Sequence, residues 1–307
     1  MRKLLQISFH DVWSKFGLVF FLYVLGLLIA GYPVILFYRT LVLETGNSAA
    51  LNVLVPAFDF TIFADFMNQS GESFRSVFRM ALLFGFLGSI VFTFFSGGVI
   101  GQLANKSRTD WNAFFRDSKN LFIPYFGLLL ITGIFLFVIF LVSGLIFFIF
   151  VILAEGSSER GYFFWLLPPS ILLIIGFSFG LVVSFYAKVM LYQNRHVGVS
   201  DAFWKAVTYV YKRPKLLVYF WSISLAGVIL TCIYLIIEKY LTMSSTFTIV
   251  LVVIVQQLNI MSRFFLKNWN YATALNAYGL EPVYFPEPKP DVIVMEESDE
   301  SENTEEA

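Results

Sequence analysis

Gln256, Gln257 and Asn259 are the only strongly polar side chains that stand deep inside the long apolar segments of this sequence. Two kinds of chemistry suit amides in such a place: hydrogen bonds between helices, or a binding site for a polar solute. Because helix residues three apart share a face, we expect Gln256 and Asn259 to point together into a bundle, while Gln257 points away. Interhelical hydrogen bonding is the favoured interpretation, because such contacts are common.

Residues for other kinds of chemistry are scattered. The two histidines, His10 and His196, lie far apart, and neither has a cysteine or carboxylate pair at ligand spacing. The single cysteine, Cys232, lies inside an apolar segment. No Walker loop, HExxH, GxSxG or Ser-His-Asp pattern occurs. We therefore expect no metal, no cofactor, no nucleic-acid partner and no enzymatic activity.

The elements that position these residues are long apolar segments. Hydrophobic residues make up 58% of the chain and charged residues 14%, against roughly 25% charged residues in soluble proteins. Six segments are apolar on every side and reach or exceed the roughly 20 residues that cross a bilayer as a helix. The prediction is an all-α, polytopic membrane helix bundle. Its six transmembrane spans lie at about 16–37, 77–100, 121–153, 163–186, 216–237 and 246–265.

Basic residues are distributed unevenly between the two sides of these spans. Sixteen of the 21 Lys and Arg residues fall on the side that carries both termini, and five fall on the other. Because Lys and Arg concentrate in cytoplasmic loops, we expect both termini in the cytoplasm. The chain is predicted to be a multi-pass membrane protein, surrounded by the lipid bilayer.

The six spans form three hairpins, and a short amphipathic segment precedes each hairpin on the cytoplasmic side. These lead-in segments, at about 8–15, 109–116 and 200–206, begin with Ser or Thr and contain an early acid, as helix N-termini do. Their aromatic and basic residues suit helices in the headgroup layer. An internal threefold repeat and ordinary loop composition explain the similarity equally well. We also predict an interfacial helix at about 53–67, after the first span, on the outer surface of the membrane.

Small residues recur at four-residue spacing in two spans. Such stripes allow close approach of helices. We predict that they join spans within one chain, and a dimer interface is the less favoured alternative. The residues are Gly85, Ser89, Thr93, Gly97 and Gly101 in the second span and Gly176, Gly180 and Ser184 in the fourth.

The sequence changes character after the last span, which divides it into a transmembrane domain at 1–280 and an acidic tail at 281–307. The tail holds ten of the 21 acids, together with four prolines. It has too little apolar surface to fold alone, so we predict disorder in the cytoplasm. A solubilising role is favoured over docking to a basic partner. Truncation after Leu280 is therefore expected to leave folding unchanged.

Two short motifs and the hairpin order carry a resemblance. The motifs are Ser-Gly-Gly-Val-Ile-Gly from Ser96 to Gly101 and Gly-Val-Ser-Asp-Ala-Phe from Gly198 to Phe203. With these features, residues 1–280 resemble a loose group of six-span bacterial membrane proteins of unknown function. The group includes the membrane domain attached to some glycerophosphodiester phosphodiesterases. The catalytic domain of those enzymes has no counterpart in this sequence, so the resemblance implies a cytoplasmic-membrane protein and no particular activity.

Two functions are compatible with these observations. The favoured one is a non-enzymatic scaffold, regulatory or assembly protein that contacts a membrane or cytoplasmic protein partner. The alternative is a transporter or lipid-handling protein that uses the polar residues of the last span. A closed bundle would favour the first, and a cavity that reaches Gln256 would favour the second. The sequence leaves the oligomeric state open.

Overall fold

The computed structural model describes residues 2–45, 60–105, 109–241 and 245–285. Within these residues the chain forms eight α-helices and no strand. Six of the helices are long and apolar enough to cross a membrane, which confirms the predicted fold class. The helices are α1 (Arg2–Trp13), α2 (Phe16–Thr45), α3 (Phe60–Ala104), α4 (Trp111–Leu153), α5 (Glu159–Gln193), α6 (Val199–Lys212), α7 (Lys215–Tyr240) and α8 (Thr246–Leu280).

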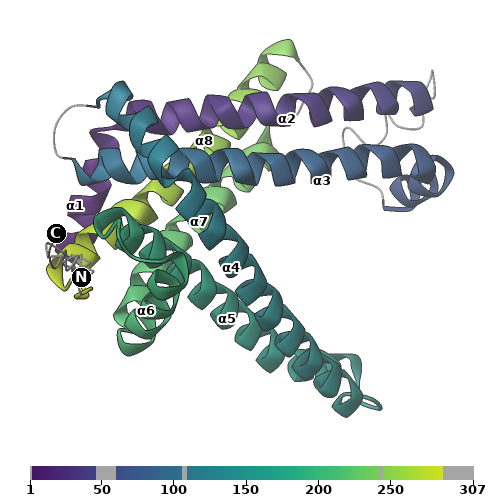
Figure 1. Cartoon of the computed structure of the whole chain (residues 1–307). Helices are drawn as coiled ribbons and strands as arrows, with labels where there is room; N and C mark the ends of the chain where they lie inside the picture. Colours follow the sequence, from purple (N-terminus) through teal and green to yellow (C-terminus); the bar gives the residue numbers. More distant parts are fainter. Residues whose placement is uncertain (1, 46–59, 106–108, 242–244, 286–307) are drawn as a thin grey trace, which may run out of the picture.

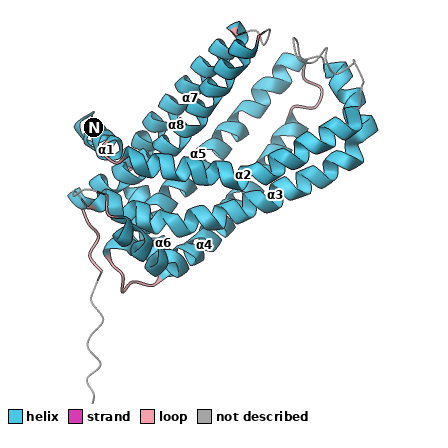
Figure 2. Cartoon of the chain, turned by 90° about the horizontal axis from the view of Figure 1, so that it is seen from above, coloured by secondary structure: helices cyan, strands magenta, loops and turns pink. Residues whose placement is uncertain are grey.

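The six long helices form three hairpins, α2/α3, α4/α5 and α7/α8, that meet at one end and diverge toward the other (Figures 1 and 2). Every long helix extends beyond the span that was predicted for it at one end or both. The common end carries α1, α6 and the C-terminal end of α8 (Figure 1).

The predicted interfacial helix at 53–67 is not a separate element where the structure describes it. Residues 60–67 form the first turns of α3, and residues 53–59 lie outside the described residues. The helix continues through the polar stretch that follows because that stretch contains no proline. The single glycine of the stretch, Gly71, lowers helix stability by only about 1 kcal/mol. The hydroxyl of Ser73 donates to Glu44 at 2.5 Å and joins α3 to the C-terminal end of α2.

Two of the three lead-in segments are separate helices, α1 and α6, and the third is the first part of α4. The side chain of Asp110 accepts a hydrogen bond from the Asn112 amide and caps α4 directly. The expectation that Ser8 begins a helix is wrong. Ser8 lies buried inside α1, where its hydroxyl accepts a hydrogen bond from Asn276 of α8 at 3.0 Å.

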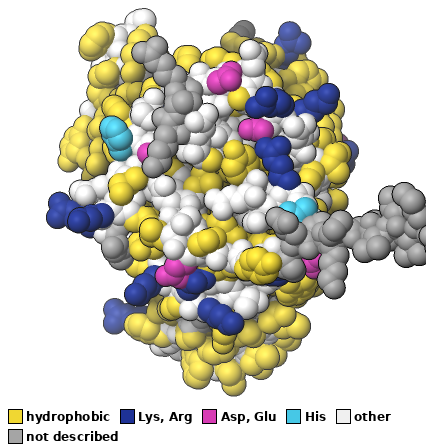
Figure 3. Space-filling model, turned by 60° about the vertical axis from the view of Figure 1, so that its left-hand side comes forward, with side chains coloured by type: hydrophobic (Ala, Val, Ile, Leu, Met, Phe, Trp, Pro, Cys, Tyr) yellow, Lys and Arg dark blue, Asp and Glu magenta, His cyan; other side chains and the backbone are white. Residues whose placement is uncertain are grey.

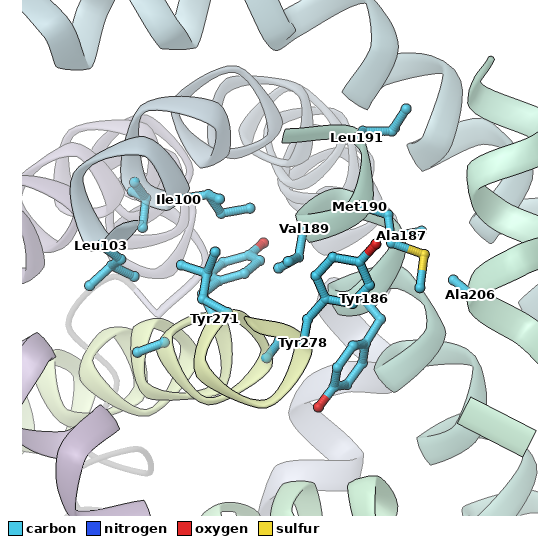
Figure 4. Close-up of a cluster of buried hydrophobic side chains, with 14 of the residues drawn as sticks. Ile100, Leu103, Tyr186, Ala187, Val189, Met190, Leu191, Ala206, Tyr271 and Tyr278 are labelled. Carbon is cyan, nitrogen blue, oxygen red and sulfur yellow. The ribbon is translucent and has the colours of Figure 1, made fainter. Parts of the chain in front are cut away.

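The buried core lies at the common end of the hairpins. Tyr271 and Tyr278 of α8 lie beside Tyr186 and Met190 of α5 (Figure 4). The apolar face of α6 packs into the same core through Phe203, and its aromatic residue Trp204 stays exposed. The lead-in at α6 therefore packs its apolar face into the protein interior, and its contact with headgroups stays a prediction.

Close helix contact fixes α3 against α4 at this end. A β-carbon on Gly98 would lie 2.4 Å from the Ser118 hydroxyl oxygen and 2.5 Å from the Phe114 carbonyl oxygen. Phe114 also packs against Phe21 of α2 and Phe95 of α3, with ring centroids 5.7 and 5.8 Å apart. The absence of a side chain at Gly98 is therefore what allows the two helices to approach.

Lys15 holds the C-terminal end of α3 in the same region. Its ammonium donates hydrogen bonds to the carbonyl oxygens of Gln102 and Asn105. Burial lowers the pKa of Lys15, and the nearby Asp11 carboxylate opposes that shift. These contacts satisfy carbonyl groups that a helix leaves without partners at its C-terminus.

The first residues after α8 fold back onto the core. Phe285 is only 6% exposed, and the Lys205 ammonium lies 3.8 Å from the centroid of its ring. The backbone amide of Val283 donates to the Tyr278 hydroxyl at 3.2 Å, and Glu281 pairs with Arg213 at 2.6 Å. Residues 281–285, which were assigned to the disordered tail, thus pack against the rest of the protein, and residues 286–307 lie outside the described part.

Candidate functional site

The three polar residues of α8 do not form one site. Gln257 accepts a hydrogen bond from the Tyr23 hydroxyl of α2 at 2.8 Å, whereas Gln256 is exposed. Asn259 is half-buried, and its side-chain oxygen has no hydrogen-bond partner among the described residues. The expectation that Gln256 and Asn259 point inward together is wrong.

The reason lies in which face of α8 meets α2. Phe264 stands seven residues after Gln257 and so lies on the same helix face. Its ring tip contacts Gly26 of α2, where an added β-carbon would lie 2.7 Å away. Packing of Phe264 against Gly26 therefore sets the rotation of α8 and turns Gln257 toward Tyr23.

A cavity of about 640 Å³ lies between the hairpins, and we call it the hairpin groove. Its walls come from α2, α3, α4, α5 and α8, and its lining is mainly apolar. None of the three polar residues predicted from the sequence lines it. The lining residues are Gly26, Ile29, Ala30, Pro33, Val34, Ala81, Phe84, Gly85, Gly88, Ser89, Phe92, Thr93, Leu129, Leu181, Ser184, Phe185, Lys188, Lys267 and Tyr271.

The small-residue stripe of α3 has two uses along its length. Gly97 and Gly101 contact α4, since an added β-carbon would meet the Asp117 carbonyl oxygen at 2.9 Å and the Asp117 carboxylate, respectively. In contrast, Gly85 has no atom of another residue within 4 Å of such a β-carbon, and it lines the groove together with Ser89 and Thr93. Three of the five residues in the predicted packing stripe therefore line the groove, and the other two form the helix contact.

The stripe of α5 divides in the same way. Gly176 and Gly180 approach Ile139 and Leu136 of α4, where added β-carbons would lie 2.9 and 2.5 Å from those side chains. Ser184, one turn further along α5, lines the groove. Helix packing is therefore confirmed for the two glycines, and the serine belongs to the cavity.

Two lysines lie at the groove wall, and the sequence had placed them at the ends of spans. Lys188 of α5 and Lys267 of α8 both line the cavity, beside Tyr271. The Lys188 ammonium donates to the Tyr271 hydroxyl at 3.2 Å, and the Lys267 ammonium lies 5.3 Å from the ring centroid of Phe92. These residues are the functional candidates that sequence reasoning missed.

A local signal for them exists in the sequence. Lys188 is followed by Val189, Met190 and Leu191, so the apolar helix continues past it. Lys267 and Tyr271 are four residues apart and therefore share a helix face. Neither pattern predicts the tertiary contact between a lysine of α5 and this face of α8.

A hydrogen bond from α4 holds the backbone of Lys188. The Tyr125 hydroxyl of α4 donates to the Lys188 carbonyl oxygen at 2.8 Å. Near the same end, Arg195 pairs with Asp117 at 3.1 Å, which ties the chain after α5 to α4. The described part of the chain brings together no group of three or more His, Cys, Asp or Glu residues that could hold a metal.

Comparison with known proteins adds no relative, because no family model, curated protein or solved structure matches this chain. The resemblance to six-span bacterial proteins therefore stays a prediction. The class of protein that the fold defines is a multi-pass helical membrane protein with an apolar groove between its hairpins.

Proposed function

We propose that this chain is a lipid-handling membrane protein that binds a bilayer lipid in the hairpin groove. The observation that carries the proposal is the groove itself, a cavity of about 640 Å³ with mainly apolar walls. Its volume falls in the range of roughly 300–1,000 Å³ that small-molecule sites occupy. An apolar chain is the ligand that such walls favour, because it leaves no polar group without a partner.

The dimensions of the groove suit half of a bilayer. On α3 it extends from Ala81 to Thr93, which corresponds to about 18 Å of helix. One leaflet of a hydrocarbon core of roughly 30 Å measures about 15 Å. Gly85 and Ser89 leave the middle of this wall almost free of side chains. An extended acyl chain fits a wall of that length and smoothness.

A closed bundle would support the scaffold function. The groove supports the lipid-handling alternative in its place, although at a different position from the polar residues of α8. The proposed function is non-enzymatic, because the sequence contains no Walker loop, HExxH, GxSxG or Ser-His-Asp pattern.

Filling the groove tests the proposal. Gly85→Trp should lower the amount of lipid that copurifies with the protein, because the new ring occupies the space of an acyl chain. A loss of only about 1.4 kcal/mol of binding free energy lowers affinity about tenfold. The measurement is native mass spectrometry of the protein released from detergent micelles.

The matched control is Gly133→Trp. Gly133 of α4 also has open space around its β-carbon position, but it does not line the groove. This variant should retain lipid like the unaltered protein. Equal lipid retention by both tryptophan variants would contradict the proposal.

We also propose that the chain lies in a bacterial inner membrane with both termini in the cytoplasm. The support is the division of basic residues, sixteen against five. Lys and Arg side chains occur across the common end of the hairpins (Figure 3). Reporter fusions at Gly46 and Ala307 should therefore report opposite sides of the membrane. Reporters in the same compartment would refute this topology.

A further inference from the structure

We infer that the hairpin groove selects lipids with an anionic headgroup, and that Lys188, Lys267 and Tyr271 hold that headgroup. This inference rests on the proposed lipid binding and adds the chemistry of the head to it. The three residues come from α5 and α8 and line the same cavity. They combine two cationic groups and a hydroxyl in a cavity whose other walls are mainly apolar.

Neither lysine is neutralised within the described part of the chain. The two ion pairs found there, Arg195 with Asp117 and Arg213 with Glu281, involve other residues. The Lys188 ammonium has one hydrogen bond to the Tyr271 hydroxyl, and an ammonium can donate three. Lys188 therefore keeps donors for a ligand.

Two like charges beside an apolar groove are costly when no anion accompanies them. Binding of an anion between them offsets their mutual repulsion and replaces lost hydration with hydrogen bonds. The Tyr271 hydroxyl accepts its hydrogen bond from Lys188, so its own proton remains available to an anionic oxygen. A phosphodiester group that has two unesterified oxygens and no cationic group in the same headgroup matches these donors and their charge.

The depth of the site indicates the leaflet. Lys188 lies about 8 Å of helix from the end of α5 at Gln193. That end belongs to the common end of the hairpins, which the proposed topology places at the cytoplasmic side. Long lysine side chains reach toward headgroups from such positions. A lipid of the cytoplasmic leaflet would thus place its phosphate at the lysines and its chain along Gly85 and Ser89.

A free phosphate compound could offer the same anionic group. We propose that a lipid supplies the anionic group, because the lysines and the apolar wall of α3 belong to one continuous cavity. A soluble phosphate ester would leave that wall without a ligand. Phosphatidylglycerol, phosphatidylcholine and glycerol 3-phosphate are therefore the three probes that separate the sources.

The experiment uses full-length protein in detergent, incubated with equimolar phosphatidylglycerol and phosphatidylcholine and analysed by native mass spectrometry. The unaltered protein should prefer phosphatidylglycerol about tenfold or more, as expected for two lysines near a membrane surface. Lys188→Met with Lys267→Met should bring this preference close to one by lowering the retention of phosphatidylglycerol, whereas the retention of phosphatidylcholine should persist. Lys212→Met with Lys215→Met removes the same charge outside the groove and should keep the preference.

Three results would overturn the inference: an unchanged preference in the groove variant, an equal loss in the control, or displacement of the lipid by glycerol 3-phosphate at the same concentration. Lys267→Met alone serves if the double variant does not fold, because it leaves the hydrogen bond from Lys188 to Tyr271 in place. It should lower the preference at least about threefold. Retention of neither lipid by the unaltered protein would instead refute the proposed lipid binding itself.

Discussion

Replacement of Gly98 by alanine is expected to destabilise the protein by about 1–3 kcal/mol, the usual cost of overpacking a well-packed contact. The added β-carbon would lie 2.4 Å from the Ser118 hydroxyl oxygen and 2.5 Å from the Phe114 carbonyl oxygen. A backbone carbonyl cannot turn aside as a flexible side chain can. The helices α3 and α4 would therefore have to separate at Gly98, within the buried core at the common end of the hairpins.

The matched control is Gly133→Ala. No atom of another residue lies within 4 Å of the corresponding β-carbon, so the helix gains only the higher propensity of alanine. Its stability should rise by no more than about 1 kcal/mol. Unfolding curves in mixed detergent micelles measure both changes. Similar stabilities of the two variants would show that α3 and α4 do not approach each other at Gly98.

Truncation after Leu280 is expected to destabilise the protein by about 2–4 kcal/mol, whereas truncation after Phe285 should leave stability unchanged. Truncation after Leu280 removes the Phe285 side chain, which is only 6% exposed. Burial of such a side chain contributes about 1.5–3 kcal/mol to stability. This truncation also removes Val283, the hydrogen-bond partner of Tyr278, a loss of about 1 kcal/mol.

The two truncated proteins differ by five residues and keep the same eight helices, so each serves as the control of the other. Thermal unfolding in detergent should separate them clearly. A large loss on truncation after Phe285 would mean that the distal acidic residues also contribute to folding. Equal stability of both proteins would show that Phe285 does not anchor the chain.

The fold class could be predicted from the sequence because the apolar segments are long and continuous. In lipid such segments must satisfy their backbone hydrogen bonds internally and therefore form helices, so the number and order of the helices follow from hydropathy alone. The helix ends were less predictable. Apolarity fades where a helix leaves the hydrocarbon layer, but α3 continues through polar residues such as Asn68 and Gln69.

The site was not predictable in the same way, because it depends on how helices rotate against each other. The pattern around Gln256 shows which residues share a face of α8 but not which face meets α2. Contact between Phe264 and Gly26 decides that question. Likewise, the spacing of Gly85 and Gly97 is the same small-residue pattern, yet one residue lines a cavity and the other touches α4.

The lysines were missed for a related reason. A positive charge near the end of an apolar run usually marks the membrane boundary. Lys188 and Lys267 satisfy that rule, and the sequence offers no sign that they belong to one cavity. Only the crossing of α5 and α8 brings them beside Tyr271.

The most direct test of lipid binding is an experimental structure of the full-length chain in nanodiscs that contain phosphatidylglycerol. A phosphate should lie within hydrogen-bond distance of the Lys188 and Lys267 ammonium groups, with an acyl chain along Gly85 and Ser89. Contact between the α2/α3 and α4/α5 hairpins along that wall, with no space for a chain, would refute lipid binding in the hairpin groove.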